Sequence, residues 1–291
     1  MKLLLKAALA LAAGSVLLVA CSNRTATTPP AGAATGPGYH PGKFVWHDLV
    51  TRDPAAARRF YGALLDWEFQ DTTRNGKTYA VAHAGGVPVA GIVAHPDPTD
   101  EPALWLSYLS VPNVDQAVEQ VAAAGGQTLY APRDLADIAR VAVVTDPQGA
   151  ALGLVRLRDG DPDDKVSPER GHVFWMEYVA ADASAALDFY SSLFGYEASL
   201  QESKGGMDYH VLRRDGRSRA GLFQIPTEAD ENVDPNWLPY VLVDDPGALA
   251  KRGESLGGTV ILAPDPGIRG GTLAIVADPT GGALALQKYP L

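Results

Sequence analysis

Apolar and polar residues along the chain follow two periods that recur in one order. Residues 44–51 alternate with a period of two, as a strand does, and residues 55–65 carry apolar side chains at helical spacing. Asp53 and the proline after it are a typical start for that helix. Alternation returns at 78–84 and 88–94, so this part of the chain predicts a strand, a helix and further strands.

The same series of elements begins again after residue 100. A strand at 104–111 precedes a helix at 114–124, which a pair of glycines ends. Three further strands are predicted near 127–130, 141–145 and 151–156. The second half of the chain repeats both series, with helices at 183–194 and 246–256. The pattern therefore predicts four units, each built as a strand, a helix and further strands.

Three pairs of matching segments indicate that the chain is duplicated. The segment WHDLVTRDPAAARRFY, which begins at Trp46, returns as WMEYVAADASAALDFY, which begins at Trp175. Two further pairs follow in the same order at nearly the same offset: WLSYLSV with WLPYVLV, and DPQGAALGL with DPTGGALAL. Chance matches would not keep both order and spacing, so we expect two copies of one domain. We place them at residues 43–158 and 171–291, joined by a charged linker at 159–170.

The segment 1–42 has the composition of a targeting segment and a tether. Lys2 and Lys6 precede a short run of small apolar residues, which is typical of a secretory signal peptide over residues 1–20. The run ends at Cys21 in the sequence LVAC, which resembles the lipobox of bacterial lipoproteins; the alternative is an ordinary secreted protein. Residues 21–42 are rich in Ser, Thr, Pro, Ala and Gly, so we expect a lipidated cysteine followed by a flexible tether.

These features predict a lipid anchor at Cys21 and a location in the cell envelope. Ser22 after that cysteine resembles the pattern for sorting to the outer membrane, facing the periplasm. Removal of the signal peptide takes the net charge from −10 to −12, which argues against nucleic acid or anionic lipid as a partner. Cys21 is also the only cysteine, which excludes an internal disulfide, a thiolate metal site and a Cys–His catalytic pair.

Four such units with these motifs resemble the vicinal oxygen chelate superfamily, which includes glyoxalase I, bleomycin and fosfomycin resistance proteins and extradiol dioxygenases. Its marks, an Asp followed by a Phe-Tyr pair and a DP-x-G hairpin, each appear twice, and the resemblance covers residues 43–289. It implies an α+β fold of four βαβββ units forming two tandem glyoxalase-like domains. Each domain would have a curled mixed sheet with a ligand cup on its concave face. Unit 1 could pair with unit 2 or, swapped, with unit 4, and the oligomeric state stays open.

The resemblance also implies a divalent metal held by His and Glu side chains at four positions of a cup. Counting back seven residues from Asp53 and Asp182 gives the first of these positions in each half. The residues at the expected positions are Trp46, Trp175, Leu106, Leu238, Gly91, Gly221, Gly153 and Ala285. None of them can bind a metal, so we predict no metal and no other cofactor. His47 is expected on the opposite, helix-facing side of its strand.

Carboxylates and aromatic rings are the remaining candidates for a binding site. Strand alternation places one carboxylate beside one tryptophan in each cup, and a tyrosine should join them from the neighbouring strand. The predicted ligand-binding residues are Trp46, Asp48, Tyr108, Trp175, Glu177 and Tyr240. Asp48 and Glu177 are also the candidate catalytic residues, because a carboxylate between aromatic walls can act as a general base. Alternatively, each carboxylate has a structural role and accepts hydrogen bonds from Tyr108 or Tyr240.

Three kinds of function agree with these features. The first is a lipid-anchored, metal-free protein that binds a small organic molecule in the cup of one or both domains. The second is an enzyme, either a metal-dependent glyoxalase- or dioxygenase-like protein, or a metal-free lyase or isomerase with Asp48 or Glu177 as base. The third is a structural or partner-binding lipoprotein whose cups are filled by their own side chains.

Overall fold

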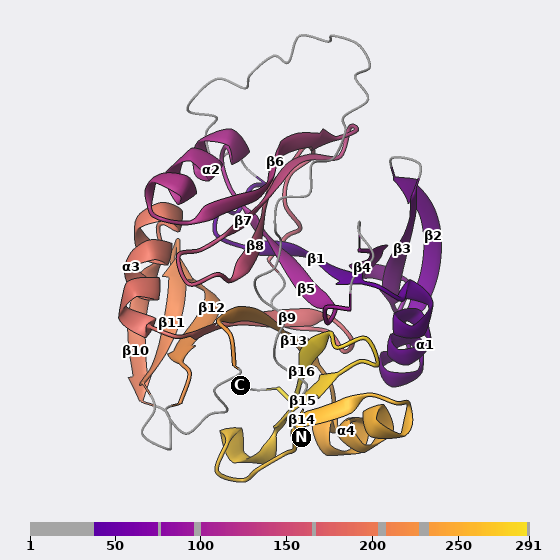
Figure 1. Cartoon of the computed structure of the whole chain (residues 1–291). Coiled ribbons are helices and arrows are strands. Elements are labelled where there is room, and N and C mark those ends of the chain that lie inside the picture. The colour runs from indigo at the N-terminus through magenta and orange to yellow at the C-terminus, as the bar shows by residue number, and fades with distance from the viewer. Residues whose placement is uncertain are drawn as a thin grey trace.

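The computed structural model describes residues 38–74, 77–95, 100–164, 167–202, 208–226 and 233–289. These residues fold into two eight-stranded sheets and four α-helices (Figure 1). No helix among them is long and apolar enough to cross a membrane. The predicted signal peptide and the lipidation site Cys21 lie outside the described ranges.

The first sheet has the strand order β2-β3-β4-β1-β5-β8-β7-β6. Its strands are β1 (Phe44–Thr51), β2 (Glu68–Arg74), β3 (Lys77–Ala84), β4 (Val87–Ala94), β5 (Leu104–Ser110), β6 (Gln127–Leu135), β7 (Ala139–Thr145) and β8 (Ala151–Leu157), and its helices are α1 (Pro54–Leu65) and α2 (Val114–Ala123). At its centre β1 runs parallel to β4 and antiparallel to β5. Unit 1 therefore closes with unit 2, which answers the pairing question that the sequence left open.

The second sheet repeats this order as β10-β11-β12-β9-β13-β16-β15-β14. Its strands are β9 (Val173–Ala180), β10 (Glu197–Glu202), β11 (Asp208–Arg214), β12 (Arg217–Gln224), β13 (Asn236–Leu242), β14 (Thr259–Leu262), β15 (Leu273–Ala277) and β16 (Ala283–Gln287). Its helices are α3 (Ala183–Phe194) and α4 (Pro246–Ser255), with a short 3-10 turn at Arg269–Gly271. The predicted α+β arrangement of four βαβββ units is confirmed.

Local side-chain chemistry decides where the helices begin and end. The carboxylate of Asp53 accepts a hydrogen bond from the Ala56 amide at the start of α1, and Asp182 does the same for Ala185 at the start of α3. Helix α3 ends at Gly195, whose φ of 65° lies in the left-handed region that glycine adopts easily. All four helices therefore lie where the sequence predicts them.

The hydrophobic pattern does not predict β2 and β10, which are edge strands of the two sheets. Their sequences, EFQDTTR and EASLQE, are mostly polar. Edge strands are paired on one side only and often carry charged side chains, so alternation is weak in them. Antiparallel pairing with β3 and β11, rather than local composition, makes these segments strands.

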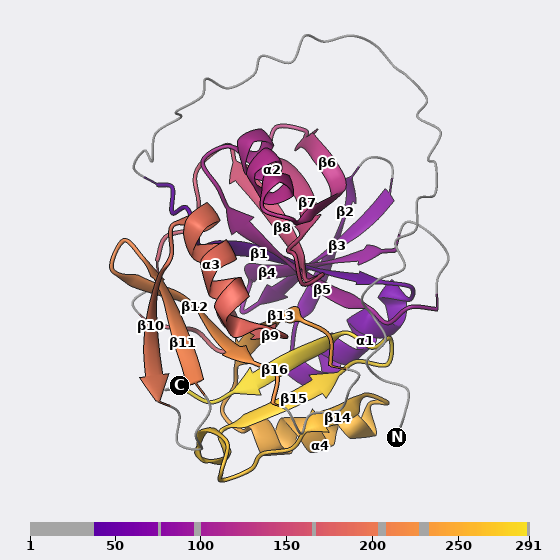
Figure 2. The same ribbon diagram turned by 60° about the vertical axis from the view of Figure 1, so that its left-hand side comes forward.

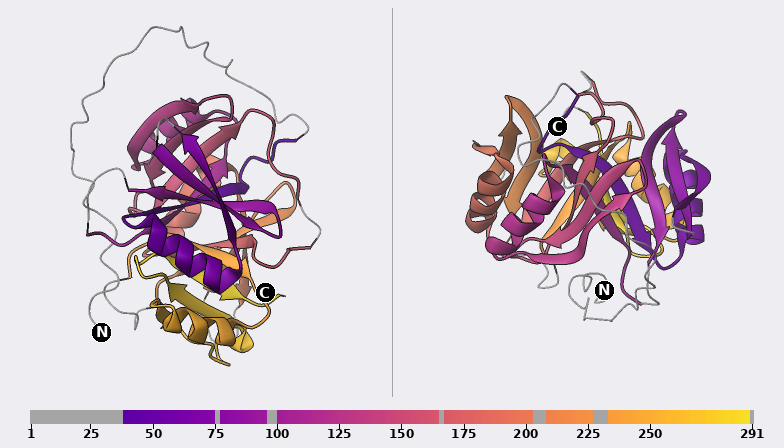
Figure 3. Two further views of the ribbon diagram at one scale, coloured as in Figure 1. Left: turned by 90° about the vertical axis from the view of Figure 1, so that its right-hand side faces the viewer. Right: turned by 90° about the horizontal axis from the view of Figure 1, so that it is seen from above.

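The two sheets pack back to back, with the helices at the seam between them. One core cluster combines α2 and α3 with residues of both sheets, for example Leu154 and Met176. The other combines α1 and α4 in the same way, with Leu49 and Val241. Figure 2 shows α2 beside α3, and Figure 3 shows α1 beside α4. The outer face of each sheet, turned away from the helices, is called the cup face below.

Matching motifs of the two halves hold the domains together across this seam. The Tyr190 hydroxyl on α3 donates a hydrogen bond of 2.8 Å to Asp146 Oδ2 in the first domain. Tyr61 on α1 correspondingly donates one of 3.1 Å to the carbonyl oxygen of Gly282 in the second domain. The repeated Phe-Tyr and DP-x-G motifs therefore have a structural role between the domains.

The first half of the predicted linker contacts both domains. Asp164 forms ion pairs with Lys43 at 3.1 Å, with Arg217 at 3.1 Å and with Arg219 at 2.6 Å. Burial opposes the ionisation of Asp164, but hydrogen bonds from Arg219 and Lys43 outweigh this effect and lower its pKa to about 2. Because Lys43 belongs to the first domain and the arginines belong to β12, the linker connects the two domains.

Candidate functional site

Alternation along β1 sends Trp46 and Asp48 to the cup face and His47 to the opposite side. His47 is 6% exposed, and its Nδ1 lies 2.8 Å from the hydroxyl oxygen of Ser107 on β5. Burial lowers the pKa of His47 to about 3, so the ring is neutral at ordinary pH. The predicted helix-facing position of His47 is confirmed.

In the first domain a carboxylate, a tyrosine and a tryptophan form a triangle of hydrogen bonds. Asp48 Oδ1 accepts one of 2.5 Å from the Tyr79 hydroxyl on β3 and one of 2.8 Å from Trp46 Nε1. Trp46 Nε1 also lies 2.8 Å from the Tyr79 hydroxyl oxygen. Asp48 is 8% exposed, and Tyr108 lies opposite Trp46 on β5. These contacts hold the carboxylate in one orientation on the cup face.

The second domain has a similar arrangement, to which Tyr240 and Arg269 also contribute. Glu177 Oε1 accepts a hydrogen bond of 2.7 Å from Tyr209 on β11, and Trp175 Nε1 donates to that hydroxyl at 3.0 Å. Tyr240 donates to Glu177 Oε2, which is the bond that the structural alternative predicts. Arg269 forms an ion pair with Glu177 Oε1. Since Glu177 is only 1% exposed, its end of this ion pair is almost entirely withdrawn from water.

The surroundings keep the tyrosines protonated and the arginine charged. Burial, and after it the charge of Glu177, raises the pKa of Tyr209 and of Tyr240. Burial opposes the charge of Arg269, but Glu177 beside it outweighs this effect and raises the pKa of the guanidinium. Both hydroxyls therefore act as hydrogen-bond donors to the carboxylate at ordinary pH.

Sequence reasoning misses three of these residues, Tyr79, Tyr209 and Arg269. The two tyrosines are separated by nearly the same offset as the repeated motifs, so a comparison of the two halves could have found them. Arg269 has no such signal, because Asp137 stands at the matching place in the first half. Its place in the site depends on the turn between β14 and β15, which is not among the repeated motifs.

Glycine at two of the expected metal-ligand positions makes room for the tyrosines. A Cβ atom on Gly91 would lie 1.9 Å from the Tyr79 hydroxyl oxygen and 2.2 Å from Asp48 Oδ1. A Cβ atom on Gly221 would lie 2.0 Å from the Tyr209 hydroxyl oxygen. Any side chain at these positions would displace the hydroxyl, so the carboxylate–tyrosine pair and a metal-binding side chain exclude each other.

The donors on the cup faces do not fit a divalent metal. A first-row metal needs several imidazole or carboxylate ligands that converge on it. Each cup face instead places one carboxylate, Asp48 or Glu177, among tyrosine and tryptophan donors. Within the described part of the chain, no group of three or more His, Cys, Asp or Glu side chains could hold a metal ion.

Apolar side chains surround the polar groups on both cup faces. In the second domain Leu238, Leu273 and Ala285 pack with Tyr240 and against Trp175. In the first domain a smaller cluster packs against Tyr108; its members are Ala139, Val141 and Val155. All six predicted ligand-binding residues thus lie on the cup faces. Glu177 and Tyr240, at 1% and 2% exposed, lie beneath the surface and position their neighbours.

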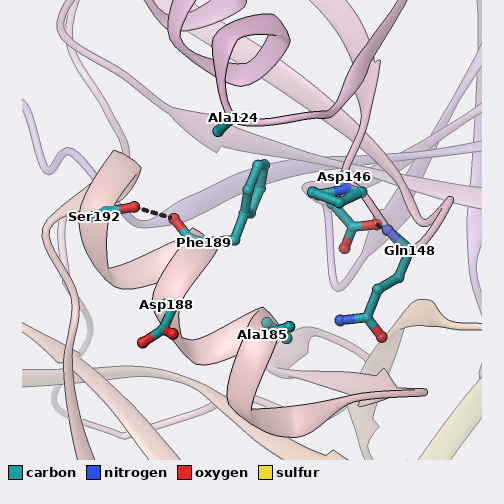
Figure 4. A pocket seen from close by; sticks show the side chains of 9 residues that line it. Ala124, Asp146, Gln148, Ala185, Asp188, Phe189 and Ser192 are labelled. Carbon is teal, nitrogen blue, oxygen red and sulfur yellow. Dashed lines mark hydrogen bonds between the residues drawn. The ribbon is translucent and has the colours of Figure 1, made fainter.

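A hollow of about 370 Å³ lies at the seam between the domains rather than on a cup face. Figure 4 shows the Phe189 ring between α3 and the turn that carries Asp146 and Gln148. Two of the polar groups there are engaged, because Asp146 Oδ1 accepts from the Gln148 backbone amide and the Gln148 side chain bonds to the backbone of Asp182. We interpret this hollow as part of the structural seam.

Comparison with known proteins identifies related sequences across both domains. The model of the Glyoxalase/Bleomycin resistance protein/Dioxygenase superfamily matches residues 43–154 and 171–286. "Putative glyoxylase CFP32" from Mycobacterium bovis and from Mycobacterium tuberculosis is 32% identical over 254 residues, which cover 86% of this chain and 96% of the relative. "Anthracycline biosynthesis protein DnrV" from Streptomyces peucetius is 29% identical over 274 residues, covering 87% of this chain and 96% of the relative.

Solved structures share the fold at low sequence identity. An Mn(II)-bound glyoxalase from Novosphingobium aromaticivorans has a TM-score of 0.56 and 16% identity, over 85% of this chain and 82% of its own. The 2,2',3-trihydroxybiphenyl 1,2-dioxygenase from Sphingomonas wittichii has a TM-score of 0.56 and 12% identity, over 86% and 91%. At these identities the likeness concerns the fold alone. The chain therefore belongs to the glyoxalase/bleomycin resistance protein/dioxygenase superfamily, which is the vicinal oxygen chelate superfamily that its sequence pattern resembles.

Proposed function

We propose that this protein binds a small organic molecule, without a metal, on the aromatic-lined cup face of one or both domains. The observation that carries the proposal is the Trp–carboxylate–Tyr arrangement, present in both domains, with glycine where a metal ligand would stand. Rigid aromatic side chains around a few fixed polar groups are typical of small-molecule sites. We further propose that Cys21 anchors the protein by lipid in the cell envelope, at the outer membrane facing the periplasm.

The carboxylate contacts favour positioning over base catalysis. A general base must offer an oxygen to the substrate and take up its proton. Glu177 has both oxygens engaged, Oε1 by Tyr209 and Arg269 and Oε2 by Tyr240. Glu177 is therefore suited to hold its neighbours in place rather than to offer an oxygen to a substrate.

A metal-free lyase or isomerase with Asp48 as base is the second candidate function. The observation in its favour is that Asp48, at 8% exposed, is closer to the surface than Glu177 at 1%. In that case turnover would fall sharply in Asp48→Asn and would follow the ionisation of one carboxylate with pH. Ligand binding without turnover favours the first candidate.

A thermal-shift screen of the full-length chain against a library of small organic molecules tests the proposed function. A ligand that binds the folded state raises the melting temperature, by mass action. We expect at least one such ligand, and we expect its effect to be lost in Trp46→Leu or Trp175→Leu. Trp67→Phe is the matched control, because Trp67 lies in the core under the helices. A library without a single hit would contradict the proposal.

Elemental analysis of the purified protein tests the absence of a metal independently. We expect far less than one equivalent of manganese, iron, nickel or zinc per chain. A near-stoichiometric content of one of these metals that survives dialysis would contradict the metal-free proposal. It would revive the metal-dependent glyoxalase- or dioxygenase-like alternative.

A further inference from the structure

Arg269 is held over the second cup face by an unusual turn. The turn Arg269–Gly271 joins β14 to β15, and all three of its residues have positive φ angles, 48°, 64° and 79° in chain order. Such a conformation is easy for the glycines but unfavourable for an arginine, so surrounding contacts must maintain it. The guanidinium supplies those contacts by pairing with Glu177. It also lies 5.4 Å from the ring centres of both Tyr209 and Tyr240.

The hydrogen-bonding capacity of this cup is almost used up by its own residues. The Tyr209 hydroxyl donates to Glu177 and receives bonds from Trp175 and Arg269. Tyr240 donates to the second carboxylate oxygen. A guanidinium carries five N–H groups, and the contacts with described residues involve only the Nη2 atom of Arg269. The hydrogen-bonding groups that remain for a ligand are therefore chiefly N–H donors of Arg269, whose side chain is 21% exposed.

We propose that the second cup recognises the carboxylate of a small organic acid through Arg269. This inference rests on the proposed function and names its ligand class. The planar fork of a guanidinium matches a carboxylate with two parallel hydrogen bonds. A phosphate dianion fits less well than a carboxylate, because Glu177 already balances the charge of the guanidinium and the second negative charge of the dianion would have no partner there. The apolar neighbours Leu238, Leu273 and Trp175 favour an acid with an apolar or aromatic body.

The first domain has an acid where the second has Arg269, so we place the proposed site in the second domain. Asp137 stands at the matching position, and it pairs with Arg158 at 2.7 Å on the exposed surface. A cationic ligand in the second cup would have to displace Arg269 from Glu177. An organic acid needs no such displacement, because it adds to the outer edge of a guanidinium that the protein already positions.

Paired acids and amides test the inference by titration calorimetry on the full chain. The probes are benzoate with benzamide, phenylacetate with phenylacetamide and indole-3-acetate with indole-3-acetamide. We expect at least one acid to bind at least about tenfold more tightly than its amide, because only the acid offers a negative charge and two equivalent acceptor oxygens to the guanidinium. Arg269→Gln should weaken the binding of that acid at least about tenfold, and Arg269→Lys should weaken its binding less. Arg140→Gln, which breaks an ion pair with Asp115 elsewhere, is the matched control and should have no effect.

The double variant Arg269→Gln with Glu177→Gln keeps the test valid if the single variant misfolds. It removes both charges and leaves amide oxygens to accept from the tyrosines, so it tests binding even if Arg269→Gln alone does not fold. Acid binding that survives in either variant would overturn the inference, and so would a panel in which no acid binds or in which acids and amides bind alike. If the acid inference fails but the library screen still finds ligands, the proposed function stands. If nothing binds in either experiment, the proposed function and the acid inference both fail.

Discussion

At the scale of single residues, neighbouring side chains decide what each titratable group can do. Glu177 pairs with the cation Arg269 and is almost fully buried, whereas Asp48, the matching acid, lies closer to the surface. His47, one residue before Asp48, points into the seam and loses its charge to burial. Strand alternation predicts the side of each residue correctly, whereas the contacts that fix its charge come from distant parts of the chain.

Replacing His47 by Gln should make the fold less sensitive to acid. The pKa of His47 is lowered from 6.5 to about 3, so below pH 6.5 the unfolded chain binds a proton that the native state does not. The free energy of unfolding therefore falls as the pH drops from 6.5 toward 3, by up to about 1.4 kcal/mol per pH unit. Urea unfolding at about pH 7 and about pH 5 measures this loss, which should shrink in His47→Gln.

The partly exposed His83 on β3 provides the control for this experiment. His83→Gln should keep the pH dependence of the wild-type protein. The same loss of stability in His47→Gln and in the wild type would show that burial of this ring does not link folding to protons.

At the scale of helices and strands, the elements with strong local signals are those that the sequence predicts. Capping by Asp53 and Asp182 marks helix starts, and alternation marks the central strands. The turn that carries Arg269 and the edge strands β2 and β10 have no such signal, because distant contacts determine them. The family resemblance predicts the sheet and the two cups, and the six candidate residues do lie there. It does not predict Tyr79 and Tyr209, which donate hydrogen bonds to the carboxylate of each cup.

Gly91→Ala should disrupt the packing of β4 against the side chain of Tyr79. The added methyl group would lie 1.9 Å from the tyrosine hydroxyl oxygen, so the ring or the strand must move. We expect a loss of about 1–3 kcal/mol in the free energy of unfolding, which is typical of overpacking. Urea unfolding of the purified variant measures it.

Gly247→Ala in α4 is the matched substitution for this comparison. Its methyl group would have ordinary neighbours, the nearest at 3.4 Å, so stability should stay the same or rise by up to about 1 kcal/mol. If Gly91→Ala is as stable as Gly247→Ala, the Tyr79 hydroxyl does not occupy the place beside this strand.

At the scale of the whole molecule, the two domains share their cores. Each main core cluster contains residues of both sheets, and Asp164 joins the two domains through ion pairs. A domain removed from its partner would expose the apolar surface that these clusters cover. The two halves should therefore fold and unfold as one cooperative unit, although the sequence shows two separate repeats.

Calorimetry of wild type and Tyr190→Phe tests this cooperativity. The substitution removes the hydrogen bond to Asp146, a buried acceptor in the other domain, and should cost about 1–3 kcal/mol. One transition should move to lower temperature as a whole. Tyr130→Phe on β6, where the ring is 37% exposed, should leave it in place. Two separate transitions, of which only one moves, would show that the domains unfold independently.

The back-to-back packing of the sheets has a further consequence for stoichiometry. Because the cup faces with Asp48 and Glu177 point to opposite sides of the molecule, ligands bound to both faces would neither contact each other nor compete for space. If both cup faces bind a ligand, each chain has two independent sites. Ligand binding should then saturate at up to two molecules per chain. A compound too short to extend around the protein could not occupy both sites at once.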